Sequence, residues 1–154
     1  MATILGVDQS FTNTGIVIID DQKMIHHEVI ASDKNQSRLV RAQMIAERVL
    51  DIAIVHSVEG VRIEGLSLGS ISSSTRDLAG LQFLILDRLT SIALEPLVIA
   101  PTSLKKKFTG NGRASKDEML DAVAADVRAI FNQIPKSRGR YDLADAYALA
   151  SIIM

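Results

Sequence analysis

The sequence predicts a single α/β domain that covers the whole chain, residues 1–154, with a mixed five-stranded sheet flanked by helices. Three short segments rich in β-branched residues are separated by polar turns, which is typical of an antiparallel meander. These segments span residues 1–7, 16–19 and 24–30. Two later apolar segments, 61–64 and 97–100, follow helical crossovers and are therefore expected as parallel strands of the same sheet.

Helical periodicity predicts the remaining elements. Helices are expected at residues 38–56, 77–94, 116–133 and 141–154. A start signal with capping-box character, Ser74 to Asp77, precedes the second helix. The Gly/Ser-rich stretch 66–74 is expected as a flexible loop, the basic stretch 105–115 as a second loop, and residues 135–140 as a basic linker.

The predicted helix at 77–94 is apolar on almost every side. Its apolar residues are Leu78, Leu81, Phe83, Leu84, Ile85, Leu86, Leu89 and Ile92. Such a helix is buried on more than one face, either between the sheet and other helices or between two protomers. We expect the second arrangement, a homodimer that uses this helix.

The composition excludes several kinds of site. The chain has no Cys, so disulfides, thiol nucleophiles and Cys-ligated zinc sites are absent, and its three His residues make a poor zinc site. No apolar run has membrane-spanning length and the N-terminus has no signal-peptide pattern, so we expect no membrane contact and a cytoplasmic location.

Charge is distributed unevenly along the sequence. The net charge is −1, but residues 104–140 hold nine Lys/Arg and only four Asp/Glu. A basic segment in an otherwise acidic chain predicts that one face of the protein meets a polyanion.

Four carboxylates stand where they could converge. Asp8 and Glu64 each end an apolar strand, and parallel neighbouring strands would bring both to one edge of the sheet. Asp142 and Asp145 are three residues apart and share one helix face. Each has an ordinary alternative: a turn cap for Asp8, a solvent-facing position beside Arg62 for Glu64, and helix-start roles for the two aspartates. Four oxygen donors together would suit Mg²⁺ or Mn²⁺, with two ions clamping a phosphate.

With these residues placed, the chain resembles the RuvC family of Holliday junction resolvases, within the RNase H-like superfamily. The similarity covers nearly the whole chain in four ordered blocks. They are Gly6-Val7-Asp8-Gln9-Ser10 with Thr14-Gly15, Ile63-Glu64-Gly65, Leu104-Lys105 through Gly110-Asn111-Gly112 to Lys116, and Asp142-Leu143-Ala144-Asp145-Ala146.

The resemblance implies an RNase H-like fold and a homodimer that cuts four-way DNA junctions to leave 5′-phosphate and 3′-hydroxyl ends. It also implies that Asp8, Glu64, Asp142 and Asp145 form the family's acidic tetrad. Lys105 and Lys116 match its DNA-contacting lysines, and Lys116 is expected to steady negative charge during cleavage.

Two departures from the family pattern are visible. Gln9-Ser10 stands where the family usually has Pro-Gly, and no aromatic residue follows Glu64. The family uses such an aromatic to engage bases near the crossover. Its absence leaves room for a phage-type member with relaxed specificity that also cuts other branched DNA.

Further DNA contacts are expected from exposed cations and hydroxyls. The candidates are Lys105, Lys106, Lys107, Arg113, Lys116, Ser70, Ser72 and Ser73. Lysines and arginines would hold phosphates without reading sequence. The alternatives are a solvated lysine loop and a flexible serine loop.

Other functions remain open from the sequence. An RNase H-like nuclease acting on RNA–DNA hybrids or flaps would use the same carboxylates, and a junction-binding protein without activity would share the fold. A sugar-kinase or actin-like phosphate binder normally needs two lobes, for which 154 residues are too few.

Overall fold

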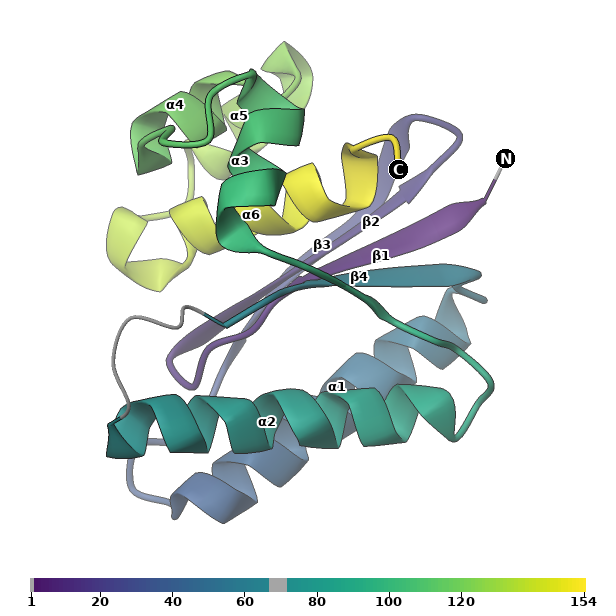
Figure 1. The fold of residues 1–154 in the computed structure, drawn as a ribbon, viewed down its shortest axis with the longest axis vertical. Coiled ribbons are helices and arrows are strands. Elements are labelled where there is room, and N and C mark those ends of the chain that lie inside the picture. Colours follow the sequence, from purple (N-terminus) through teal and green to yellow (C-terminus); the bar gives the residue numbers. More distant parts are fainter. Residues whose placement is uncertain (1, 67–71) are drawn as a thin grey trace.

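The computed structural model describes residues 2–66 and 72–154 and contains one mixed sheet between two helical layers (Figure 1). The strands are β1 (Thr3–Asp8), β2 (Asn13–Asp20), β3 (Lys23–Ala31), β4 (Gly60–Glu64) and β5 (Leu97–Ile99). Their order across the sheet is β3-β2-β1-β4-β5. The first three pair antiparallel, whereas β4 pairs parallel with both β1 and β5, as the sequence predicts.

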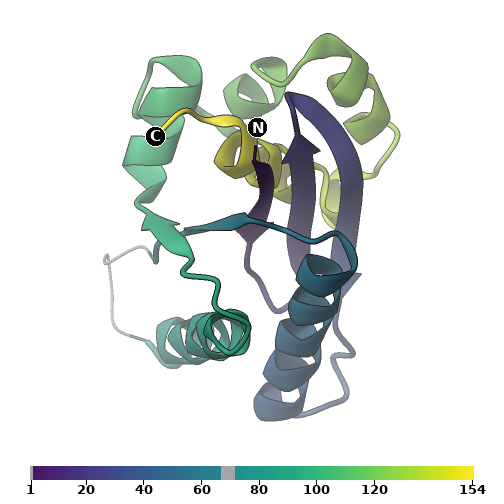
Figure 2. The ribbon, with the colours of Figure 1, turned by 90° about the vertical axis from the view of Figure 1, so that its right-hand side faces the viewer.

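Helices cover both faces of the sheet. They are α1 (Arg38–Val55), α2 (Ser73–Thr90), α3 (Pro101–Thr109), α4 (Lys116–Asp121), α5 (Ala125–Phe131) and α6 (Arg140–Ser151), with a 3₁₀ turn at Lys136–Arg138. The pair α1 and α2 lies on one face, and α6 lies on the other under the smaller helices α3 to α5 (Figures 1 and 2). Alternate strand residues therefore enter two different cores: Leu5 and Ile18 pack toward α1 and α2, and Val17 packs toward α6.

Helix α6 lies unusually close to the strands because two glycines leave room for it. A Cβ atom at Gly6 would stand 2.1 Å from the Ala146 carbonyl oxygen, and one at Gly15 would stand 2.3 Å from the Asp142 carbonyl oxygen. Any larger residue at either position would push the helix off the sheet. These contacts place the first turns of α6 directly over the ends of β1 and β2.

The basic stretch 105–115 is not a loop throughout, so that prediction was wrong for its first half. Residues Pro101–Thr109 form α3, with Pro101 in the first turn and Gly110 in the left-handed conformation just after the helix. Proline at the start and glycine at the end are both favoured because they suit the special backbone of helix termini. Leu104 and the half-buried Phe108, four residues apart, hold α3 against the rest of the molecule.

The single helix expected at 116–133 is two short helices instead. Ser115 caps α4 in a reciprocal capping box with Glu118. The chain then leaves the helical path before α5, and Arg128 of α5 donates to the carbonyl oxygen of Asp121 at 2.7 Å. That bond satisfies a carbonyl freed by the break, which is a usual requirement at helix ends.

Helix α2 begins slightly earlier than predicted and is less completely covered than expected. Ser72 is its N-cap, accepting a hydrogen bond from the Thr75 amide. Leu81, Ile85 and Leu89 are fully buried against α1 and the sheet, while Phe83 on another face is 73% exposed.

Candidate metal centre

Asp8 and Glu64 emerge at the same edge of the sheet. Strands β1 and β4 run parallel, with Val7 opposite Ile63, so the next residue of each strand carries its carboxylate to a common edge. Each is the last residue of its strand.

The contacts of Arg62 show which face of β4 packs against α6. The Arg62 guanidinium donates to the carbonyl oxygens of Leu149, at 3.1 Å, and of Ile152, both at the C-terminal end of α6. Residues two apart on a strand share a face, so Glu64 also faces the layer that contains α6. The solvent-facing alternative for Glu64 is therefore wrong.

Helix α6 brings its two aspartates to this edge. It starts after Gly139, which has φ 107°, and Asp142 lies in its first turn. The Asp142 backbone rests on Gly15, and Gly15 is the residue opposite Asp8 in the antiparallel pair. Asp145, one turn further along the helix, then points at the same edge.

Three of the four carboxylates meet closely enough to share a cation. One carboxylate oxygen each from Asp8, Glu64 and Asp145 lie within 4.8 Å of one another, the only such group of acidic, His or Cys residues among residues 2–66 and 72–154. Asp142 is outside this group and contacts it through Asp8, with which it shares a side-chain hydrogen bond. The structure thus separates a compact triad from a fourth, adjacent carboxylate.

The carboxylates are electrostatically strained without a cation. Burial raises the pKa of Asp8 well above its usual value, and the charges of Asp145, Glu64 and Asp142 raise it further. Burial followed by the charges of Glu64 and Asp142 raises the pKa of Asp145 to about 7. Burial also raises the pKa of Glu64 and of Asp142. Only protons or a cation can relieve this repulsion, so the donor set fits a divalent metal ion.

Two of the predicted lysines face this cluster. The charge of Lys105 on α3 opposes the rise in pKa of Glu64 and Asp145, and Lys116 at the start of α4 does the same for Asp142 and Asp145. The Lys116 ammonium also lies 5.9 Å from the centre of the Tyr141 ring.

The other predicted DNA contacts lie further out. Lys106, Lys107 and Arg113 are exposed on α3 and the loop after it. Ser72 and Ser73 are exposed at the start of α2, where Ser72 is engaged as the helix cap. Ser70 lies outside the described residues.

A small cleft opens beside the carboxylates. It has a volume of about 210 Å³ and is lined by Asp8, Gln9, Glu64, Gly65, Leu66, Leu78 and Pro101. Strand ends, α2 and the start of α3 therefore all border the site, which leaves the carboxylates accessible from one side.

Sequence reasoning missed two buried glutamines beside this cleft. Gln9 follows Asp8, and Gln82 lies in the middle of α2; both are less than 10% exposed and both donate to the Glu64 carbonyl oxygen. Gln9 had a signal, since it departs from the family pattern. Gln82 had none, because its position over Glu64 depends on how α2 packs.

Comparison with known proteins identifies the family. A family model described as crossover junction endodeoxyribonuclease RuvC matches residues 4–152. The chain belongs to the RuvC family. It is 28% identical over 157 residues to the RuvC crossover junction endodeoxyribonuclease of Synechococcus sp. strain CC9311, covering 96% of this chain and 94% of the relative. It is 31% identical over 153 residues to that of Bdellovibrio bacteriovorus, covering 96% and 86% of the two chains.

A solved RuvC structure shares the fold. The structure of Thermus thermophilus RuvC in complex with a Holliday junction substrate matches with a TM-score of 0.80 at 21% identity, covering 97% of this chain and 91% of that one. The predicted RNase H-like fold class is thereby confirmed. Within the part of the chain that the structure describes, no helix is long and apolar enough to cross a membrane.

Proposed function

We propose that this RuvC family member is a divalent-metal-dependent endonuclease that cuts four-way DNA junctions. The observation that carries the proposal is the triad of Asp8, Glu64 and Asp145, which are half-buried and each offer an oxygen within 4.8 Å of the other two. A family match over residues 4–152 supplies the reaction class. Binding of a junction by the related Thermus protein supports the choice of DNA substrate.

The carboxylates have separate places in this proposal. Asp8, Glu64 and Asp145 would hold the first Mg²⁺ or Mn²⁺ ion, and Asp142 with Asp8 would hold a second. Such ions activate a water for attack on a phosphodiester and neutralise the charge on the leaving oxygen. The products are then a 5′-phosphate and a 3′-hydroxyl.

The lysines beside the cluster serve the phosphate. Lys105 and Lys116 face the carboxylates from α3 and α4, and their charges oppose the repulsion there. A phosphate entering the open side would meet both ammonium groups. We assign Lys116 to steadying the negative charge that grows on the scissile phosphate, as a positioned cation does.

The experiment that tests the function compares DNA structures. Labelled four-way junction, fork, flap, linear duplex and RNA–DNA hybrid are each incubated with the protein in Mg²⁺, Mn²⁺ or EDTA. We expect metal-dependent cuts in the four-way junction, weaker cuts in fork and flap, and none in linear duplex. Preferred cutting of the hybrid would support a different RNase H-like nuclease, and junction binding without cuts would support a non-catalytic protein.

The exposed cations of α3 and its following loop would bind the DNA backbone. Lys106 and Lys107 follow Lys105 on α3, Arg113 lies in the loop after it, and all three are exposed. Replacing Lys106 and Lys107 together by Ala should weaken binding to every DNA structure and lower the slope of log K against log salt by about 2, since each phosphate contact contributes roughly one unit. Fluorescence anisotropy at several salt concentrations measures this slope, and an unchanged slope would remove these lysines from the interface.

We also propose that α2 forms the contact of a homodimer. Gly80 is exposed in the middle of α2, and a Cβ atom added there would meet nothing within 4 Å. A mid-helix glycine costs about 1 kcal/mol relative to alanine, and no contact with residues 2–66 or 72–154 requires it. Phe83, one turn later, is 73% exposed. A smooth site beside a protruding ring is what close approach of a second α2 helix needs.

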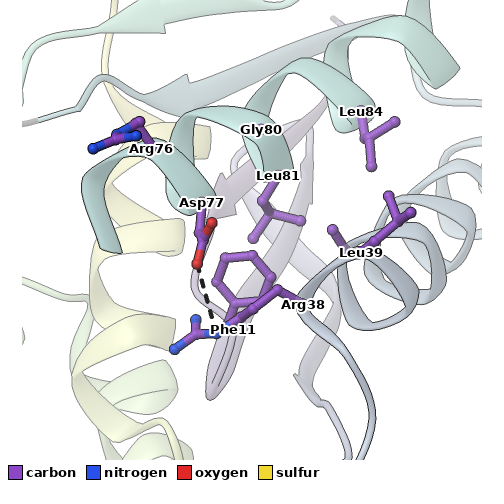
Figure 3. Close-up of a pocket in the computed structure, with 9 residues that line it drawn as sticks. Phe11, Arg38, Leu39, Arg76, Asp77, Gly80, Leu81 and Leu84 are labelled. Carbon is purple, nitrogen blue, oxygen red and sulfur yellow. Dashed lines mark ion pairs between the residues drawn. The ribbon is translucent and has the colours of Figure 1, made fainter. Parts of the chain in front are cut away.

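A pocket next to Gly80 completes this surface. Figure 3 shows Phe11, Leu39, Leu81 and Leu84 around it, with an ion pair between Arg38 and Asp77. The charged atoms of that pair lie 3.9 Å apart. Its volume of about 320 Å³ and its apolar walls suit an aromatic side chain. We propose that Phe83 of a second copy enters this pocket.

The dimer is tested by solution mass. We expect the wild-type protein to be a dimer by light scattering and Phe83→Asp to be a monomer, because a buried charge at the centre of an apolar contact is costly. Val55→Asp is the matched control, since Val55 is 75% exposed at the far end of α1. A monomeric wild type, or a Phe83→Asp variant that remains dimeric, would contradict this interface.

A further inference from the structure

The Glu64 carbonyl oxygen is held by two buried glutamine side chains. The Gln9 amide nitrogen donates to it at 2.8 Å and the Gln82 amide nitrogen at 3.1 Å. Gln82 donates as well to the Gln9 side-chain oxygen at 3.2 Å. The two side-chain amides and the one backbone carbonyl thus form a closed hydrogen-bond network, which we call the glutamine network.

The glutamine network replaces the backbone pairing between β1 and β4, which ends at this point. The ladder between β1 and β4 stops at Val7 and Ile63, while on the other side the Gly65 amide still donates to Ile99 of β5 at 2.7 Å. The N–H and C=O of one peptide point in opposite directions, so the Glu64 carbonyl points away from β5 and toward β1. Because the β1–β4 ladder has ended, the two glutamine amides take the place of a strand partner for this carbonyl.

The end of β4 needs such support because of the charges it carries. The Glu64 carboxylate must stay within 4.8 Å of those of Asp8 and Asp145, although like charges favour separation. Hydrogen bonds to the backbone of Glu64 oppose that separation. Amide donors also have no net charge, so they fix the strand end without neutralising the site as a Lys or Arg would.

We infer that Gln9 and Gln82 are positioning residues that hold the end of β4 so that the Glu64 carboxylate meets Asp8 and Asp145 in a geometry ready for a divalent cation. The inference rests on the proposed metal-dependent function. Proline, which the family usually has in place of Gln9, has no side-chain donor, so this form of support is a feature of the present chain. Gln82 links the same strand end to α2.

The test measures metal binding without DNA. Titration calorimetry of the metal-free protein with Mn²⁺ should give about tenfold weaker binding for Gln82→Met than for the wild type, in the range found when groups that orient metal ligands are removed. Methionine keeps the size of the side chain and removes its donor. Gln9→Met should show a similar loss and provides a second measurement where Gln82→Met folds poorly.

Control measurements separate positioning from general loss of structure. Ile85 lies one turn along α2 from Gln82, and Ile85→Val loosens the core without changing the glutamine network. This variant should bind Mn²⁺ as the wild type does. Gln82→Met should also need more Mg²⁺ for half-maximal junction cleavage while its junction affinity in EDTA stays unchanged.

The outcomes distinguish this inference from the function on which it depends. If Gln82→Met and Gln9→Met both bind Mn²⁺ with wild-type affinity and the wild type cuts junctions, the positioning role of the glutamine network is overturned. The nuclease assignment would still stand. A wild-type protein that neither binds Mn²⁺ nor cuts junctions would overturn both.

Discussion

Asp8→Asn should lower the rate of junction cleavage by about a thousandfold or more while junction binding persists. Asp8 belongs to the triad with Glu64 and Asp145 and also shares a side-chain hydrogen bond with Asp142. It would therefore hold both of the proposed metal ions. An amide there removes a negative ligand and leaves a donor facing the other carboxylates. Metal ions contribute several kcal/mol to such reactions, and each 1.36 kcal/mol corresponds to a factor of ten in rate.

Cleavage and binding are measured on the same labelled junction, with cleavage in Mg²⁺ and binding in EDTA. Asp51→Asn makes the same chemical change on an exposed turn of α1 and should cut at the wild-type rate. An Asp8→Asn protein that cuts like the wild type would show that Asp8 does not serve the metal. Loss of binding together with cleavage would instead assign Asp8 to the DNA contact.

The features of the site that follow from strand order could be predicted from the sequence. An apolar strand that ends on a carboxylate is visible at Asp8 and Glu64, and a parallel crossover brings both to one edge. The sequence also carries a signal for the close approach of α6, because glycines, Gly6 and Gly15, occupy the positions where that helix touches the sheet. The different positions of Asp142 and Asp145, one outside the triad and one within it, could not be predicted, since residues one turn apart on a helix look equivalent in sequence.

One error came from a basic segment in which charge masked a short helix. The stretch that includes Lys105 to Lys107 reads as a solvated loop by composition, yet Pro101, Leu104 and Gly110 carry the start, packing and end signals of α3. The consequence reaches the site, because a helix fixes where Lys105 points and a loop would not. Gln82 was missed for a different reason: whether a helical glutamine meets Glu64 depends on the rotation of α2 against the sheet.

Helix α2 connects two proposals that rest on different observations. Gln82 faces inward and holds the end of β4, whereas its neighbour Phe83 faces outward and is proposed to enter a second copy. A helix that is rigid over one turn would transmit a shift at the dimer contact to the Glu64 carbonyl. The two surfaces are therefore expected to be sensitive to each other, although only the inward one touches the site.

The metal-free protein should become less stable as pH rises from 5 toward 8, because of Asp145. Burial and neighbouring charges raise the pKa of Asp145 from 3.8 to about 7. A raised pKa means that the folded state binds its proton more tightly than the unfolded state does. The resulting stability is fully present below the unfolded pKa and is lost as pH rises through the folded pKa. At about 1.4 kcal/mol for each pKa unit, roughly 3 kcal/mol of stability is lost between pH 5 and 8, and the remainder of the loss falls below pH 5.

Asp145→Asn removes this contribution together with the part of the rise in the Asp8 pKa that the Asp145 charge causes. Burial lowers the pKa of His26, which works in the opposite direction near neutral pH, but His26 is common to both proteins. In EDTA, the melting temperature of Asp145→Asn should exceed that of the wild type by on the order of 10 °C at pH 8, and the gap should narrow toward pH 5.

Mg²⁺ should reduce this difference in melting temperature by stabilising the wild type. It binds the ionised wild-type carboxylates and relieves their repulsion, while the amide of the variant offers a weaker ligand. Differential scanning fluorimetry at three pH values, with Mg²⁺ or EDTA, measures all of these differences. A gap that is constant with pH would show that Asp145 is ionised without strain, and a gap that Mg²⁺ leaves unchanged would show that the carboxylates at this edge of the sheet do not bind the ion.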